Sequence, residues 1–161
     1  MTLVLYRIDD RLIHGQVVVG WGQPLDIGFI VLVDDEVASS EWEQELYRMG
    51  VPPEMEVHFL SVDEAVRQLG RYRDDARQGI LLTGDIETMR QLVNGGGIAN
   101  VNLGGIHHRA GRIQRLRYIF LTPDEEAALR NLASRGVTIS AQDVPGARPI
   151  PLDDLLAGVA T

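Results

Sequence analysis

The chain has 161 residues, of which 45% are apolar and 24% are charged, a profile typical of one soluble globular domain and unlike a disordered or fibrous protein. It contains no cysteine, which excludes disulfides, cysteine-ligated zinc, iron–sulfur clusters and thiol nucleophiles. The 23 acidic and 15 basic residues leave a net charge of −8, and this balance argues against a nucleic-acid-binding protein.

All 15 basic residues are arginine, so a Schiff-base lysine and a Walker-type lysine are both excluded. Four arginines gather in one short segment, at Arg109, Arg112, Arg115 and Arg117. No apolar run approaches the roughly 20 residues needed to span a bilayer, and the N-terminal segment lacks the pattern of a signal peptide. We therefore expect a cytoplasmic protein.

Short apolar runs alternate with amphipathic stretches along the whole chain. In chain order they predict a strand over 2–8, a helix over 15–22, a strand over 27–33, a helix over 40–49, a strand over 56–60, a helix over 61–75, a strand over 79–83, a helix over 85–93, strands over 100–103 and 115–121, a helix over 122–136, a strand over 137–141 and a short helix over 151–156. This alternation indicates right-handed βαβ crossovers, and hence an α/β fold with an open, mostly parallel sheet and helices on both faces.

Ligands of open parallel sheets bind beyond the carboxyl ends of the strands. The loops at that edge are predicted at 9–15, 34–37, 84–85 and 104–112, and they hold three of the four histidines. Functional side chains are therefore expected in these loops.

The first of these loops follows the first strand and reads RIDDRLIHGQV over residues 7–17. His14 stands at the predicted helix start, where free backbone N–H groups and the helix dipole favour an anion. Arg7 and Arg11 offer planar guanidinium groups that suit phosphate oxygens, and Asp9 or Asp10 could orient the imidazole or brace Arg11. Such a loop suits a histidine that carries a phosphoryl group, while a capping histidine in a solvated turn is the structural alternative.

The second loop, over residues 102–112, contains Gly104 and Gly105, which allow a sharp turn or a close approach of another loop. The adjacent His107 and His108 raise the possibility of a metal site, but neighbouring residues in an extended loop point opposite ways and no carboxylate stands at ligand spacing. We expect no metal there. Contact with phosphate or a partner by His107, Arg109 or Arg112 competes with a plain tight loop.

The segment RIDDRLIHGQV closely resembles the active-site segment of the IIB subunits of the bacterial phosphoenolpyruvate-dependent sugar phosphotransferase system, in the mannose/fructose/sorbose family. The segments VLVDDEVA at 31–38, VNLGGIHHRAGRIQ at 101–114 and NLASRGVTISAQDVP at 131–145 resemble the family as well. Two positions depart from the family pattern: His108 replaces a common aromatic residue, and Arg112 replaces a usual lysine. The resemblance covers nearly the whole chain and implies one IIB domain over residues 1–161.

The resemblance implies about seven strands, the last antiparallel, and a phosphorylated histidine that matches His14 and reacts through Nδ1. Arg11 would stabilise the phosphoryl group, and the residues implied to bind phosphate or support the loops are Asp9, Asp10, Leu12, Ile13, Gly15, Gly104, Gly105 and His107. Arg109 and Arg112 would bind a partner, with Leu12, Ile13 and Ile106 as apolar contacts. No cofactor is implied.

The implied activity is a protein-histidine–sugar phosphotransferase reaction. A IIA protein of the mannose family would donate the phosphoryl group, and a sugar held by membrane IIC and IID subunits would accept it. These subunits could also hold the protein at the inner membrane, and homo-oligomer formation is left open. One alternative is a regulatory phosphoacceptor of an incomplete phosphotransferase system that signals to a protein partner. Another is a metal-dependent hydrolase using His107, His108 and Asp34.

Overall fold

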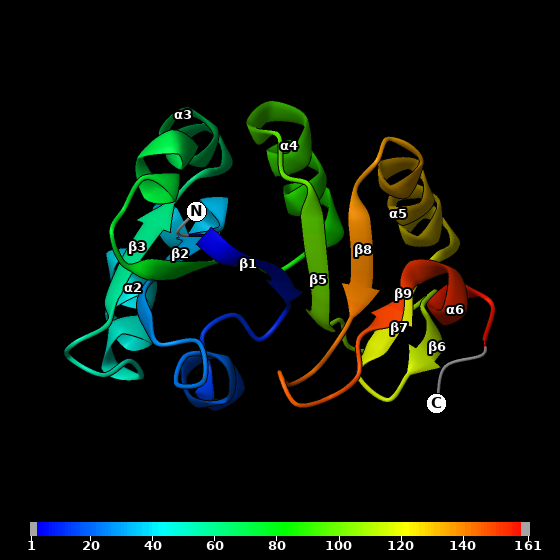
Figure 1. Ribbon diagram of the computed structural model, residues 1–161, viewed down its shortest axis with the longest axis horizontal. Helices are drawn as coiled ribbons and strands as arrows, with labels where there is room; N and C mark the ends of the chain where they lie inside the picture. The colour runs from blue at the N-terminus through cyan, green and yellow to red at the C-terminus, as the bar shows by residue number, and fades with distance from the viewer. Residues whose placement is uncertain (1–2, 159–161) are drawn as a thin grey trace.

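The computed structural model of the chain describes residues 3–158 and has one central sheet. Seven strands form it in the order β3-β2-β4-β1-β5-β8-β9 (Figure 1). Their bounds are β1 Leu3–Asp9, β2 Ile27–Val33, β3 Glu56–Leu60, β4 Gln78–Thr83, β5 Asn100–Gly105, β8 Thr138–Ala141 and β9 Ile150–Pro151. All neighbours pair in parallel except β8 and β9, which are antiparallel. The predicted open, mostly parallel sheet is confirmed.

Helices cover both faces of this sheet, as expected (Figure 1). On one face lie α3 (Val62–Arg73), α4 (Ile86–Gly96) and α5 (Pro123–Ser134), with α6 (Leu152–Leu156) beside β8 and β9. On the other lie a π-helix, η1 (Gln16–Trp21), and the helices α1 (Asp35–Ala38) and α2 (Glu41–Met49). Each layer encloses its own apolar cluster, so the β strands in the middle of the sheet are buried from both sides.

Several helices begin where the sequence predicts. Ser61 caps α3 and Thr122 caps α5, each in a reciprocal capping box with the glutamate three residues later. Asp85 accepts the hydrogen bond that caps α4. These caps satisfy backbone N–H groups that a helix start otherwise leaves unpaired, which is why the sequence signal for them is strong.

Four elements differ from the expectation. Residues 115–121 are not one strand but part of a hairpin of β6 (Ile113–Leu116) and β7 (Ile119–Leu121), because a turn without glycine or proline lies at residues 117–118. The helix expected over 15–22 is a π-helix, and α1 occupies a segment expected as a turn. β9 escaped prediction because it has two residues and includes a proline. It is the antiparallel strand of the sheet, whereas the segment 137–141, predicted as the last strand, is β8 and pairs in parallel with β5. Thr2, the first residue of the predicted first strand, lies outside the described residues.

The described part of the chain, residues 3–158, has no helix with the length and apolar character of a membrane span.

Candidate functional site

The imidazole of His14 is held by a buried carboxylate from the end of the preceding strand. Nε2 of His14 lies 3.0 Å from Oδ2 of Asp9, whose side chain is fully buried, whereas the His14 side chain is 19% exposed. The other ring nitrogen, Nδ1, accepts a hydrogen bond of 3.3 Å from the backbone N–H of Gln16. A ring that accepts at Nδ1 donates at Nε2, so the contacts favour the tautomer protonated on Nε2.

The chain reaches this position through a tight turn between β1 and η1. The Leu12 N–H donates to the Asp9 carbonyl at 2.9 Å, and Leu12 has a left-handed φ of 59°, a conformation that non-glycine residues adopt rarely and that recurs at functional sites. The first N–H groups of η1, from Val17 and Val18, donate to the His14 carbonyl at 3.0 Å. The turn thus presents His14 at the carboxyl edge of the sheet.

Asp9 is the electrostatic centre of the site. Its carboxylate accepts from His14, from Arg7 Nη2 at 3.4 Å, and from both the backbone N–H and the Nε of Arg11, at 3.1 and 3.3 Å. Burial raises the pKa of the Asp9 carboxyl, but the hydrogen bond and charge of His14 and the charge of Arg7 outweigh burial and hold the pKa below its usual value. Asp9 is therefore an anion that stabilises positive charge on its neighbours.

Arg7 is fully buried beneath this carboxylate. Its Nη1 donates to Asn102 Oδ1 and, at 2.8 Å, to the carbonyl of Gln142, and its guanidinium lies 4.9 Å from the ring centroid of Trp21. Burial lowers the pKa of Arg7 and Asp9 opposes that effect, although an arginine stays protonated throughout the range in which proteins fold. A buried cation with this many partners fixes the position of Asp9.

The carbonyl of Asp143 collects three donors from the same region. Arg7 Nη2 reaches it at 3.1 Å, Gln16 Nε2 at 3.1 Å and Trp21 Nε1 at 2.9 Å. The segment after β8 is thereby tied to both ends of the His14 turn. Sequence reasoning did not single out the Asp143 carbonyl, because a backbone carbonyl leaves no side-chain signal in the sequence.

Arg11 lies on the outer side of the site, with its side chain 42% exposed. It contacts Asp9 through Nε, and its Nη2 donates to Gln16 Oε1. These bonds place the guanidinium against the same carboxylate that contacts Nε2 of His14.

The glycine-containing loop over 102–112 is attached to the His14 loop by hydrogen bonds between Asp10 and His107. Asp10 Oδ2 accepts from the backbone N–H of His107 at 2.7 Å, and Asp10 Oδ1 lies 2.6 Å from His107 Nδ1. Arg112 then donates from Nη1 to the His107 carbonyl at 2.7 Å and forms a two-pronged ion pair with Glu125, at 3.0 and 2.8 Å. The chain of contacts links the His14 turn to the start of α5.

Gly104 and Gly105 of that loop lie close to side chains of β1. A Cβ on Gly104 would lie 2.0 Å from Arg7 Cζ, and one on Gly105 would lie 3.0 Å from Asp9 Oδ1. Gly104 therefore makes room for the buried guanidinium, and Gly105 for the carboxylate that holds His14. Gly15 is different, because a Cβ there would meet nothing within 4 Å.

The apolar residues expected to contact a partner are buried. Leu12 and Ile13 are each 8% exposed and pack in the η1 layer, and Ile106 is 2% exposed and lies in the opposite layer. They support the loops from beneath. Val19 on η1, five residues after His14, is an exposed apolar side chain, at 52%.

The arginine-rich segment separates into residues with different surroundings. Arg112 is 9% exposed in its pair with Glu125, and Arg115 pairs with Glu126 at 2.6 Å. Arg117 is 83% exposed and reaches Asp143 Oδ2 at 3.2 Å. The Arg109 side chain is exposed and forms no ion pair with any residue from 3 to 158. Arg109 and Arg117 are thus the solvent-exposed cations of this segment.

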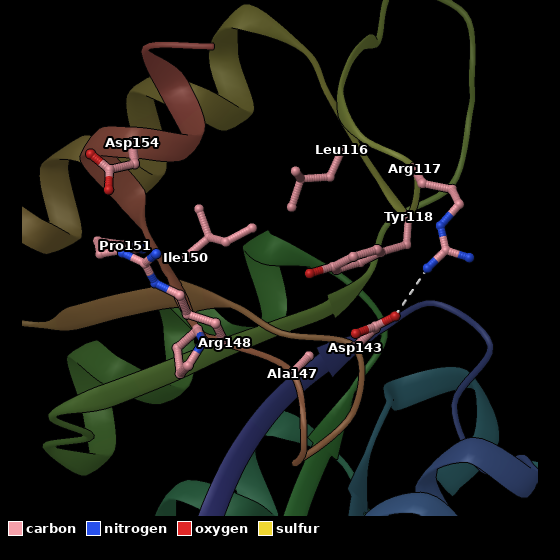
Figure 2. A pocket seen from close by; sticks show the side chains of 10 residues that line it. Leu116, Arg117, Tyr118, Asp143, Ala147, Arg148, Ile150, Pro151 and Asp154 are labelled. Carbon is pink, nitrogen blue, oxygen red and sulfur yellow. Dashed lines mark hydrogen bonds and ion pairs between the residues drawn. The ribbon is translucent and has the colours of Figure 1, made fainter. Parts of the chain in front are cut away.

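A cavity of about 490 Å³ lies between the β6–β7 turn and the segment after β8. Figure 2 shows Arg117, Tyr118 and the Arg117–Asp143 pair on one side of it, and Arg148, Ile150 and Asp154 on the other. Asp143 therefore touches this cavity with its carboxylate and the His14 site with its carbonyl.

No group of three or more potential metal ligands occurs among residues 3–158. Asp34 caps α1 by accepting from the Val37 N–H at 2.9 Å, and the His108 ring stacks edge-on against Phe120 with centroids 5.7 Å apart. His107 is occupied by Asp10. The three side chains named for a metal-dependent hydrolase are each engaged elsewhere.

The chain matches a family of known proteins. The sequence model of the family described as PTS system sorbose subfamily IIB component matches residues 3–160. The chain belongs to this family. As a IIB component it takes part in sugar phosphotransfer, and the resemblance that the sequence motifs indicated is confirmed.

Curated relatives of this IIB component match it over most of its length. It is 32% identical over 149 residues to the N-acetylgalactosamine-specific phosphotransferase enzyme IIB component 1 of Escherichia coli (strain K12), with 90% of this chain and 92% of that protein covered. It is 33% identical over 146 residues to the PTS system sorbose-specific EIIB component of Klebsiella pneumoniae, with coverage of 89% and 88%.

Solved structures agree with the fold of this IIB component. The IIBSor domain of the sorbose permease from Klebsiella pneumoniae superimposes with a TM-score of 0.87 at 31% identity, with 99% of both chains covered. ManxB from Thermoanaerobacter tengcongensis gives a TM-score of 0.87 at 30% identity, with 96% of this chain and 95% of that chain covered.

Proposed function

We propose that this IIB component is a phosphocarrier: His14 accepts a phosphoryl group from a phosphohistidine on a IIA protein and donates it to a sugar bound by membrane IIC and IID subunits. The observation that carries the proposal is the arrangement of the imidazole. Asp9 engages Nε2 at 3.0 Å, while Nδ1 accepts a long hydrogen bond from a backbone N–H. An unprotonated Nδ1 is the nucleophile that phosphoryl transfer requires.

The two steps balance with the IIA protein, this protein, the sugar and the membrane subunits that hold the sugar. The Nδ1 lone pair forms a bond to phosphorus as the bond from phosphorus to the IIA histidine breaks, and the IIA imidazole recovers its electron pair. The proton on Nε2 of His14 stays beside Asp9, whose negative charge offsets the positive charge that the phosphorylated ring acquires. In the second step a sugar hydroxyl bonds to phosphorus, the Nδ1–phosphorus bond breaks, and the hydroxyl proton leaves to a base in the sugar's site.

Arg11 and the turn supply the positive field for this step. Phosphoryl transfer depends on positioning and on charge stabilisation more than on covalent machinery. Arg11 is held by Asp9 and Gln16, both of which also contact the His14 ring, and its planar group can exchange those contacts for phosphate oxygens. The Gln16 N–H, which now meets Nδ1, is placed to donate to the phosphoryl group instead. We assign Arg11 as a catalytic residue of the transfer.

The remaining predicted residues support this arrangement from below and beside it. Asp10 and His107 join the two loops, and Arg112 extends the connection to Glu125. We propose that Arg112 acts mainly through this connection, and that Arg109 is the arginine that meets a partner, since its side chain is exposed.

A IIA donor is supported by the relatives. The chain is 29% identical over 160 residues to the PTS system mannose-specific EIIAB component of Escherichia coli (strain K12), and it covers 50% of that protein. The name of that relative joins a IIA and a IIB component in one protein. We propose that a separate IIA protein or domain plays the same part for this chain, and that residues 1–161 act as a single IIB domain.

Reconstitution distinguishes the proposed transport function from the regulatory alternative. The protein is combined with phosphoenolpyruvate, enzyme I, HPr, its cognate IIA and membrane vesicles that hold IIC and IID, and sugar phosphate is measured. We expect sugar phosphate to form and its formation to stop when His14 is changed to alanine. Phosphate that reaches His14 but never a sugar would instead favour a regulatory phosphoacceptor.

A further inference from the structure

The outer face of α2 carries an apolar stripe that the residues from 3 to 158 leave exposed. Trp42 is 72% exposed, Leu46 is 49% exposed and Met49 is 76% exposed. The three residues follow one another at helical spacing (i, i+4, i+7), so they lie on one face of the helix. They make up half of the large exposed apolar side chains between residues 3 and 158. We call these three residues the α2 stripe.

The opposite face of α2 fixes the helix to the fold. Tyr47 packs against the apolar cluster beneath η1, and Gln44 Nε2 donates to the carbonyls of Val37 and Ala38 at 3.0 and 3.1 Å. Arg48 lies over the ring of Phe59 on β3 at 5.0 Å. Since the helix is attached through polar and aromatic contacts on its inner side, the exposure of the α2 stripe is a feature of a fixed helix. Contiguous exposed apolar side chains of this kind mark interaction sites.

The charges around the α2 stripe narrow the choice of partner. Glu41, Glu43 and Glu45 lie on the same helix, against the single cation of Arg48. Carboxylates are repelled by the anionic surface of a cytoplasmic leaflet. Arg48 lies 3.9 Å from Glu45, which leaves α2 with a net negative charge, so a two-fold pairing of α2 with its copy would bring two acidic helices together. The α2 stripe therefore suits an apolar surface with a basic rim.

Membrane proteins offer such a rim on one side, because their cytoplasmic loops carry an excess of lysine and arginine. We propose that the α2 stripe docks this IIB component onto the basic cytoplasmic face of the membrane subunits that bind the sugar. This inference rests on the proposed function, which gives the protein a partner in the membrane.

The position of α2 in the fold leaves the His14 edge of the sheet free while the α2 stripe is bound. α2 contacts the edge strand β3, whereas His14 follows β1, three strand positions away in the order β3-β2-β4-β1 (Figure 1). At the ordinary strand spacing this is about 14 Å across the sheet. One surface can then hold the protein at the membrane while the His14 edge meets the IIA donor or the sugar.

The test uses a variant with Trp42→Gln, Leu46→Gln and Met49→Gln, since glutamine keeps a good helix propensity. Co-sedimentation with vesicles that hold the cognate IIC and IID is compared with phosphorylation of His14 by IIA in solution. We expect vesicle binding to weaken about tenfold, as for the loss of anchor residues at an interface, and phosphorylation by IIA to stay unchanged. The matched control is Val4→Gln, at an exposed apolar residue of β1; it should bind the vesicles like the wild type.

Three outcomes overturn the proposal. If the triple variant binds the vesicles as tightly as the wild type, the α2 stripe is not part of the interface. If the melting temperature of the triple variant falls, the single variant Trp42→Gln is used in its place. Equal binding of the wild type to vesicles without IIC and IID makes lipid the partner. A wild-type dimer that the triple variant loses in analytical ultracentrifugation makes a second copy the partner. Failure of IIA to phosphorylate wild-type His14 counts against the proposed function, while vesicle binding still reports on the α2 stripe.

Discussion

Gly104 lies directly against the guanidinium of Arg7, so that a Cβ at Gly104 would stand 2.0 Å from Arg7 Cζ. Arg7 holds Asp9, and Asp9 holds the His14 ring. The buried Arg7 therefore fixes Asp9, and Asp9 fixes His14. This arrangement requires glycine at position 104 in the second loop, because a side chain there would occupy the place of Arg7.

Gly104→Ala should destabilise the protein and displace Arg7. Overpacking of a filled interior typically costs about 1–3 kcal/mol, and here the clash falls on a buried charge with no room to move. Urea unfolding measures the change. The control is Gly70→Ala on α3, where a Cβ meets nothing within 4 Å and alanine in place of glycine stabilises a helix by about 0.5–1 kcal/mol. Equal stability of the two variants would show that Arg7 does not fill the space beside Gly104.

Arg112→Ala should lower stability at neutral pH and change how stability depends on pH. Burial raises the pKa of Glu125. The hydrogen bonds from Arg112 and from the backbone N–H of Thr122 lower it by more, so the pKa lies below its usual value. A carboxyl with a lowered folded-state pKa adds stability above its unfolded pKa, and that stability is lost as pH falls through the folded value.

The difference between wild type and Arg112→Ala should therefore be full at pH 7, about 1.5–3 kcal/mol for a charged hydrogen-bonded pair. It should shrink as pH falls below about 4.3, the ordinary value for glutamate. Unfolding curves between pH 3 and pH 7 measure it. A difference that stays constant across this range would mean that Arg112 stabilises the loop without Glu125.

Arg11→Ala should slow phosphoryl transfer to His14 and leave the fold intact, because the Arg11 side chain is 42% exposed. Loss of one charge-assisted bond in the transition state costs about 1.5–3 kcal/mol, or about one to two orders of magnitude in rate. Arg11→Lys should recover part of the loss, since lysine keeps the charge but lacks the planar fork. Rapid-quench transfer from phosphorylated IIA gives the rates, and wild-type rates in Arg11→Ala would remove Arg11 from the reaction.

Arg109→Ala should reduce the salt dependence of the IIA-to-His14 transfer rate. An open cation near the reactive loop steers an acidic partner, and that effect weakens as ionic strength rises. Arg130→Ala, at an exposed arginine on α5, is the matched control for loss of charge elsewhere and should keep the wild-type slope. Identical slopes for all three proteins would exclude steering by Arg109.

The sequence was informative where local chemistry decides the structure. Buried apolar runs predicted the strands, and Ser61 and Thr122 predicted helix starts, because both signals act over a few residues. The sequence predicted that His14, Asp9 and Arg11 lie close together because they share one turn.

Contacts across the fold could not be found this way. The Asp143 carbonyl that binds Gln16 and Trp21 comes from 122 or more residues away, and the Asp10–His107 pair joins two loops that are 97 residues apart. The sequence also could not predict which arginines are exposed. Arg109 and Arg112 look alike in sequence, but only Arg112 pairs with Glu125 on α5.

The most direct measurement is phosphorus NMR of the protein after phosphorylation by IIA, joined to mapping of the labelled residue. The account predicts one phosphohistidine, at His14, with the chemical shift of an Nδ1-phosphate and with no signal in His14→Ala. A phosphate on Nε2 of His14, or a label on His107 or His108 that survives in His14→Ala, would contradict it.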